Sequence, residues 1–161
     1  MELTFMQSLA LGAGYVAVGM AAIGSTIGAG MAGSTAIAAW KKCYQQGKIA
    51  PFLLVAMVSA PLSQTIYAML MMFLTKDDIV KNPQFAIAYV CIGLLGGLAQ
   101  MASAIFQGRC GAGGCAALAE TGKGFGNYMI VLGAVETCAI FAMVFSFMAL
   151  PYSKLFTVPA V

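Results

Sequence analysis

The chain has 161 residues, of which 61% are hydrophobic and 8% are charged. A typical soluble domain is about 45–50% apolar and about 25% charged, so we expect a single-domain integral membrane protein. Lysine and arginine number 8 against 5 aspartates and glutamates, an excess too small to indicate nucleic-acid binding. Histidine is absent, which removes the commonest general base.

A membrane-spanning helix needs about 20 consecutive apolar residues. Four segments meet this requirement, at residues 5–39, 51–74, 84–119 and 127–150. Polar connections separate them at residues 41–48, 76–83 and 120–127. The predicted fold is therefore all-α, with four transmembrane helices. The first and third segments exceed the bilayer thickness, so we expect them to tilt or to project from the membrane.

The two halves of the chain resemble one another. Residues 28–33 match residues 108–113 at an offset of 80, and residues 66–69 match residues 140–143 at an offset of 74. Both halves run in the same direction, which indicates a duplicated hairpin rather than an inverted repeat. The predicted organisation is one membrane domain of two hairpins, residues 1–75 and residues 76–161.

The basic residues predict an orientation by the positive-inside rule. Five belong to the first and third connections and the end of the third span: Lys41, Lys42, Lys48, Arg109 and Lys123. Three belong to the opposite side: Lys76, Lys81 and Lys154. We therefore expect both hairpin turns in the cytoplasm, and both termini and the middle connection outside.

Small residues recur every four positions in the first and third spans. The first row is Ala17, Ala21, Ser25, Ala29 and Gly33, with Gly24 and Gly28 beside it, and the second is Ala104, Gly108, Ala112 and Ala116. Such rows let helix backbones approach closely, and this packing holds helices together in lipid. The second and fourth spans are bulkier. We expect the small-residue helices to form a crowded inner layer of a closed ring of copies, with the bulky helices outside.

One acidic residue lies within a span. Glu136 is near the middle of the fourth span, whereas the other four acidic residues lie at ends or connections: Glu2, Asp77, Asp78 and Glu120. A charge at that depth costs at least about 2.5–3.5 kcal/mol, so the carboxyl group must be protonated, paired or bound to a cation. This pattern predicts an ion or proton site.

Other polar residues occur at a similar depth. Ser63, Gln64 and Tyr67 are in the second span, and Gln107 precedes Lys123 by about as many residues as Glu136 follows it. Pro61 lacks an N–H group and is expected to leave carbonyl groups near it available as ligands.

These groups offer hard oxygen donors around one negative charge, which suits a monovalent cation better than a divalent or soft metal ion. A neutral carboxylic acid needs only one or two hydrogen bonds. The additional oxygens favour Na⁺ as the bound ion, and H⁺ remains the alternative.

The motifs Pro61–Tyr67, Gln107–Arg109 and Val135–Thr137, together with the duplicated hairpin, resemble the rotor-ring proteolipid (the K subunit, which forms a c-type ring) of bacterial V-type, or A/V-type, ATPases. The resemblance implies that the ion is held by side chains of the second, third and fourth spans and by one backbone carbonyl. By position these ligands are Glu136, Gln64, Ser63, Gln107 and the carbonyl of Ala60, with Tyr67 hydrogen-bonded to the carboxylate. Ser63 stands where the family often has threonine, which keeps the hydroxyl group.

The resemblance also implies partners and a location. Copies would form a homo-oligomeric ring in the bacterial inner membrane, in contact with lipids, with a stator membrane protein that carries a buried arginine, and with central-stalk proteins at the cytoplasmic turns. The chain would carry Na⁺, or less favoured H⁺, need no other cofactor and bind no nucleic acid. It would not be an enzyme, because ATP hydrolysis and synthesis belong to other parts of the complex.

Two other classes of protein fit the sequence less well. A stand-alone four-helix channel or transporter would have polar residues along a continuous path, or inverted repeats. A purely structural membrane protein would have no carboxylate in mid-membrane. The isolated polar cluster, the parallel repeats and Glu136 disfavour both.

Overall fold

The computed structural model describes residues 4–150, and its regular elements are all helices. They are, in chain order, α1 (Phe5–Gln45), α2 (Leu54–Ser59), the 3₁₀ turn η1 (Ala60–Leu62), α3 (Ser63–Lys81), the 3₁₀ turn η2 (Pro83–Phe85), α4 (Ala86–Thr121) and α5 (Phe125–Met148). Four stretches are long and apolar enough to cross a membrane: Phe5–Gln45, Leu54–Lys81, Pro83–Thr121 and Phe125–Met148. The predicted all-α membrane fold with four transmembrane helices is confirmed.

The second and third polar connections are shorter than the sequence suggested, and the first is shifted to residues 46–53. Helix α1 continues to Gln45, and α3 continues through the charged residues to Lys81, so most of the expected connection 76–83 is helical. The lysines and the glutamine that extend α1 are good helix formers, and α3 continues from its apolar segment through Asp77 and Asp78. The second turn is confined to Asn82 and η2, where Pro83 begins a new direction.

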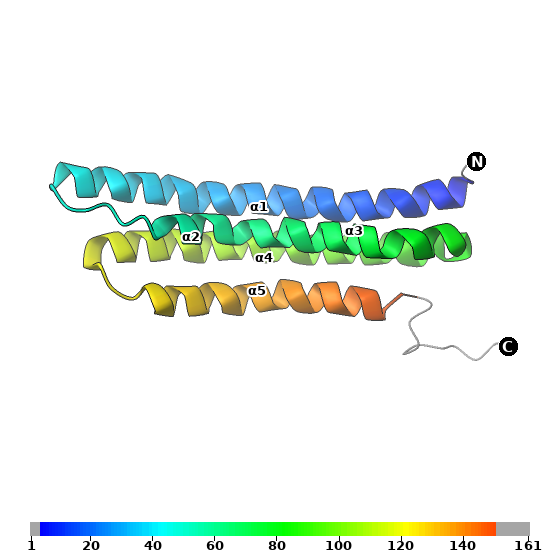
Figure 1. Cartoon of the computed structure of the whole chain (residues 1–161). Coiled ribbons are helices and arrows are strands. Elements are labelled where there is room, and N and C mark those ends of the chain that lie inside the picture. The colour runs from blue at the N-terminus through cyan, green and yellow to red at the C-terminus, as the bar shows by residue number, and fades with distance from the viewer. Residues whose placement is uncertain (1–3, 151–161) are drawn as a thin grey trace.

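The hairpin turns lie at one end of the bundle and the α3–α4 turn lies at the other (Figure 1). Helices α1 and α4 therefore run in the same direction, as two parallel hairpins require. The boundary drawn between residues 75 and 76 lies inside α3. Which end faces the cytoplasm stays a prediction, and two of the charged residues, Glu2 and Lys154, lie outside the described residues.

The turn between α4 and α5 depends on two glycines. Gly122 and Gly124 have φ angles of 66° and 88°, a left-handed conformation that only glycine adopts without strain. These angles reverse the chain within the three residues 122–124. As a result α5 returns directly alongside α4.

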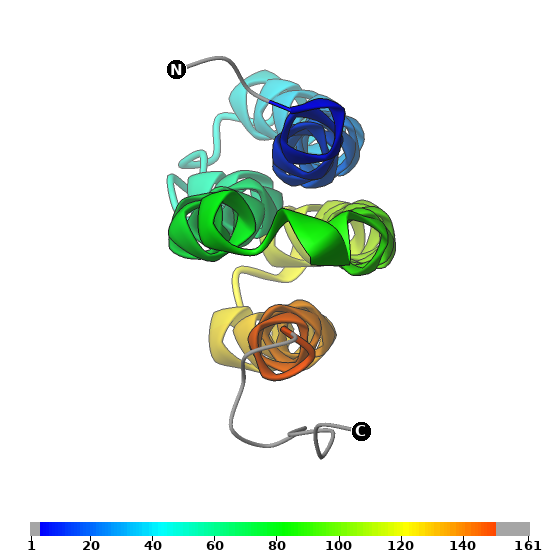
Figure 2. The same ribbon diagram turned by 90° about the vertical axis from the view of Figure 1, so that its right-hand side faces the viewer.

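Helices α1 and α4 pack with their backbones in contact. A Cβ atom added to Gly108 would overlap the backbone of Gly28, and one added to Gly93 would meet the carbonyl of Ala13. Viewed along the bundle, α1 lies on one side of the α3–α4 pair and α5 on the other (Figure 2). The close packing of the two small-residue spans is confirmed, and their place inside a ring stays a prediction.

The buried residues depart from the predicted four-residue rows. In α1 the buried positions continue from Ala21 through Gly28 to Ala32, whereas Ala29 and Gly33 are only partly buried. In α4 they are Ala104, Gly108, Gly111 and Cys115, while Ala112 is partly buried and Ala116 is exposed. The reason is geometric: four residues turn an α-helix by more than a full revolution, so the contact line alternates steps of three and four.

Candidate ion-binding site

Glu136 lies half-buried on α5, and both of its carboxylate oxygens accept a hydrogen bond from another helix. The hydroxyl of Tyr67 on α3 donates to Oε1 at 2.5 Å. The Nε2 group of Gln107 on α4 donates to Oε2 at 3.3 Å. Three helices that are distant in sequence therefore meet at one carboxylate, at the depth that the sequence predicted.

The two predicted glutamines form a buried pair beside the carboxylate. Gln64 Nε2 donates to Gln107 Oε1 at 2.9 Å and to Ser103 Oγ at 3.2 Å. Gln64 and Gln107 are both 0% exposed. Burial of an amide is tolerated when its polar atoms are hydrogen-bonded, so this pair is a defined polar centre and not a surface feature.

The break in the second span positions Ser63. Pro61 is buried in η1, which separates α2 from α3, and its missing N–H group leaves the carbonyl of Met57 without its helical donor. The hydroxyl of Ser63 lies 3.0 Å from the carbonyl oxygen of Ala60 and 3.3 Å from Oε1 of Gln64.

The Ala60 carbonyl is not a free ligand, contrary to the expectation from its place next to Pro61. It accepts hydrogen bonds from both the backbone N–H and the hydroxyl of Ser63. A cation could take this oxygen only if the hydroxyl rotates away, which a serine side chain does readily. All six predicted site residues belong to one connected network.

The oxygens of this network suit a small, hard cation. The network holds one carboxylate, two amide oxygens, the hydroxyl groups of Ser63, Tyr67 and Ser103 and one backbone carbonyl, with a single negative charge. No group of three or more histidine, cysteine, aspartate or glutamate side chains gathers as a metal site within residues 4–150. The donor set therefore fits a monovalent ion or a proton.

Two polar residues on α4 were missed by the sequence reasoning. Ser103 accepts from Gln64 and donates to the carbonyl of Val135 at 3.0 Å. Gln100 is 0% exposed and donates to the carbonyl of Ala139 at 2.9 Å. A signal was present, because Gln100, Ser103 and Gln107 are spaced i, i+3 and i+7 and so share one helix face.

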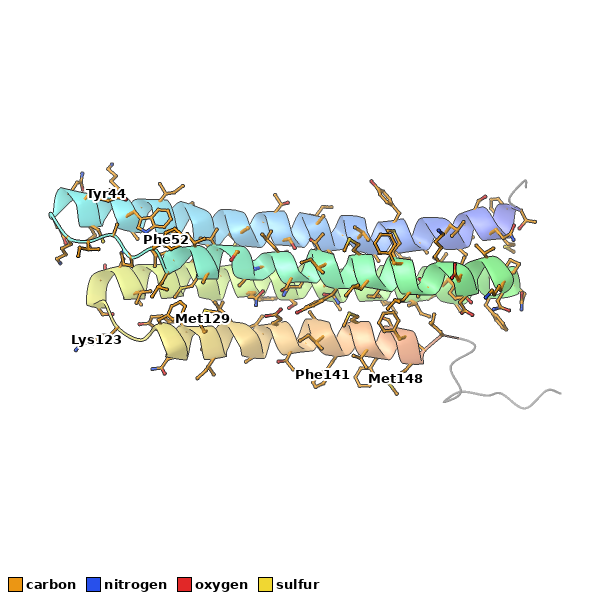
Figure 3. The ribbon with its side chains drawn as sticks, viewed as in Figure 1. Tyr44, Phe52, Lys123, Met129, Phe141 and Met148 are labelled. Atoms are coloured by element: carbon orange, nitrogen blue, oxygen red, sulfur yellow. The ribbon has the colours of Figure 1, made fainter. Side chains whose placement is uncertain are left out.

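The outer side of α5 is apolar and open. Phe141 projects from α5 on the side opposite α4 (Figure 3) and is 56% exposed. Ile130 and Val131 are also exposed. A half-buried carboxylate thus lies next to a surface suited to hydrocarbon, which is the surface of a multi-pass membrane protein with one polar centre.

Fold and site together define an integral multi-pass membrane protein whose last helix carries a half-buried carboxylate hydrogen-bonded to two other helices. Residues 90–149 match the family model that describes the C subunit of ATP synthase. This segment is a little over a third of the chain and includes Gln100, Ser103, Gln107 and Glu136. No curated protein matches the chain.

The second hairpin of the chain, which carries Glu136, is therefore similar to the C subunit of ATP synthase.

Proposed function

We propose that the chain is the rotor-ring proteolipid of a bacterial V-type ATPase and carries one Na⁺ at Glu136 of each copy. The observation that carries the proposal is the carboxylate of Glu136 held between Tyr67 and Gln107, next to a second, fully buried glutamine. A site of this kind in mid-membrane is costly and is retained for function.

Na⁺ is favoured over H⁺ by the number of oxygens. Tyr67 and Gln107 alone provide the one or two hydrogen bonds that a carboxyl group needs. Ser63, Gln64 and the carbonyl of Ala60 are then in excess for a proton site. They are the neutral oxygen ligands that a desolvated Na⁺ requires in addition to one carboxylate.

The V-type assignment rests on the ratio of carboxylates to helices. The repeat offset of 74 aligns Glu136 with Leu62, so two hairpins share one carboxylate. Leu62 is 49% exposed, which matches an apolar surface at the equivalent position of the first hairpin. The duplicated hairpin with one ion site is the arrangement that the resemblance to the V-type proteolipid implies.

The mechanism follows from the charge of Glu136. A bound cation neutralises the carboxylate, and the occupied site can then pass through lipid as the ring turns. An empty site carries the negative charge of Glu136, and we propose that the buried arginine of the stator protein holds such a site at the interface between ring and stator. Ion occupancy would thus decide when rotation is permitted, while central-stalk proteins at the cytoplasmic turns would couple rotation to ATP chemistry elsewhere in the complex.

Carbodiimide labelling of Glu136 in the purified protein tests the ion assignment, because the reagent attacks a protonated carboxyl group. We expect millimolar Na⁺ to suppress labelling at fixed pH and K⁺ to leave it unchanged, with Glu136→Gln as the unlabelled control. Labelling that follows pH alone would instead support an H⁺ rotor. Absence of labelling at Glu136 would contradict the ring assignment itself.

A further inference from the structure

Helix α5 is attached to α4 by a row of hydrogen bonds to its backbone. Three side chains of α4 each donate to a carbonyl of α5: Gln107 to Leu132 at 3.0 Å, Ser103 to Val135 at 3.0 Å, and Gln100 to Ala139 at 2.9 Å. Steps of three and four residues on both helices keep the donors and acceptors in register. This set of three bonds is called the α4–α5 ladder below.

The ladder surrounds Glu136. Leu132 and Val135 precede the carboxylate on α5, and Ala139 follows it one turn later. Leu132 and Ala139 are also the buried residues of α5, whose remaining surface is largely exposed. These bonds, together with the packing of Leu132, Phe125 and Tyr128 in the apolar core, fix the rotation of α5 about its own axis and with it the direction of the Glu136 side chain.

Burial of the Gln100 amide carries an energetic cost. Its Oε1 atom is buried and accepts no hydrogen bond from residues 4–150. The amide cannot be turned over to relieve this, because Oε1 would then face the carbonyl oxygen of Ala139, an acceptor against an acceptor. An apolar side chain of the same size would remove an unsatisfied group and so would not destabilise the fold.

We propose that Gln100 is a positioning residue for ion binding. By its bond to Ala139 it holds the helical turn of α5 that follows Glu136 against α4, so that the carboxylate meets Tyr67 and Gln107. Gln100 lies seven residues before Gln107, or roughly 10 Å along α4, and it touches none of the predicted ion ligands. The role rests on the proposed function, since it acts through the cation site of Glu136.

The variant Gln100→Met tests this role in the full-length protein. It removes one interhelical hydrogen bond and the orphaned acceptor together, while keeping the side-chain volume. We expect the Na⁺ concentration for half-protection of Glu136 to rise about three- to tenfold. Carbodiimide labelling in Na⁺-free buffer should become about threefold faster or more. The temperature of thermal unfolding should stay the same or rise.

Thr65→Val is the matched control. The Thr65 hydroxyl lies 2.8 Å from that of Ser25 and joins α3 to α1, so this variant also loses one interhelical hydrogen bond but leaves α5 untouched. We expect its labelling and Na⁺ protection to match those of the wild type. Weaker Na⁺ protection in Gln100→Met without a fall in its unfolding temperature distinguishes positioning from a merely structural role.

The outcomes separate the two proposals. If wild-type Glu136 labels but Na⁺ does not protect it, the Na⁺ assignment fails, and the labelling rate in Na⁺-free buffer still decides the role of Gln100. If Gln100→Met labels like the wild type, or if Thr65→Val shifts labelling equally, the positioning role is overturned. If wild-type Glu136 does not label, both proposals fail.

Discussion

The backbone contact between α1 and α4 makes a sharp prediction for Gly108→Ala. An added Cβ atom would overlap the Cα, carbonyl carbon and oxygen of Gly28. These are backbone atoms of a rigid helix and cannot rotate aside, so the two helices must separate. Separation would also loosen the contacts of Gly24 with Met101 and of Gly97 with Ala17 further along the same seam.

The expected magnitude follows from two opposing effects. Overpacking costs about 1–3 kcal/mol, and a backbone clash belongs at the upper end of that range. Replacing a helical glycine by alanine gains about 0.5–1 kcal/mol. The net loss for Gly108→Ala is therefore about 2 kcal/mol, which corresponds to a drop of roughly 4–8 °C in the unfolding midpoint for a chain of this length.

The assay is thermal unfolding of the detergent-solubilised protein, followed by far-ultraviolet circular dichroism. The matched control is Gly113→Ala on the same helix, because a Cβ atom there meets no heavy atom within 4 Å. We expect that variant to unfold at the wild-type temperature or slightly above it. Equal midpoints for the two variants would refute backbone contact between α1 and α4.

Three further predictions concern the site and the ends of the helices. Tyr67→Phe removes the 2.5 Å hydrogen bond to Glu136. A hydrogen bond to a charged group contributes about 1.5–3 kcal/mol. We therefore expect the Na⁺ concentration that protects half of Glu136 from carbodiimide to rise at least about tenfold. Ser63→Ala should also weaken Na⁺ protection, whereas Ser63→Thr, which keeps the hydroxyl group, should protect like the wild type; equal behaviour of the two variants would remove Ser63 from the ligands. The ion pair between Lys42 and Glu120 is 2.9 Å long, but its side chains are 57% and 61% exposed, so Lys42→Ala should leave the unfolding midpoint unchanged, and a drop of several degrees would show that this pair stabilises the bundle.

The sequence was informative where one residue broke a strong pattern. Glu136 is conspicuous because it is the one acidic residue inside a predicted span, and counting residues from the turn then places Gln107 at its depth. The structure joins Gln64, Gln107 and Tyr67 to that carboxylate. Depth along a helix is thus predictable from sequence, because the helical rise per residue is fixed.

Rotation about the helix axis was harder to predict. The four-residue rows were wrong beyond Ser25 and Gly108 because small errors in angle accumulate with each turn. Gln100 and Ser103 were missed for a related reason: a single polar residue in a membrane helix is ordinary, and only the shared face with Gln107 distinguishes these two. Their acceptors are backbone carbonyls of α5, which carry no signature in the sequence.

Equilibrium binding of radioactive Na⁺ to the purified protein tests the central claim most directly. We expect saturable binding that approaches one ion per chain and disappears in Glu136→Gln, while Thr65→Val binds like the wild type. Absence of saturable binding, or binding that persists in Glu136→Gln, would contradict a Na⁺ site at the carboxylate held by Tyr67 and Gln107.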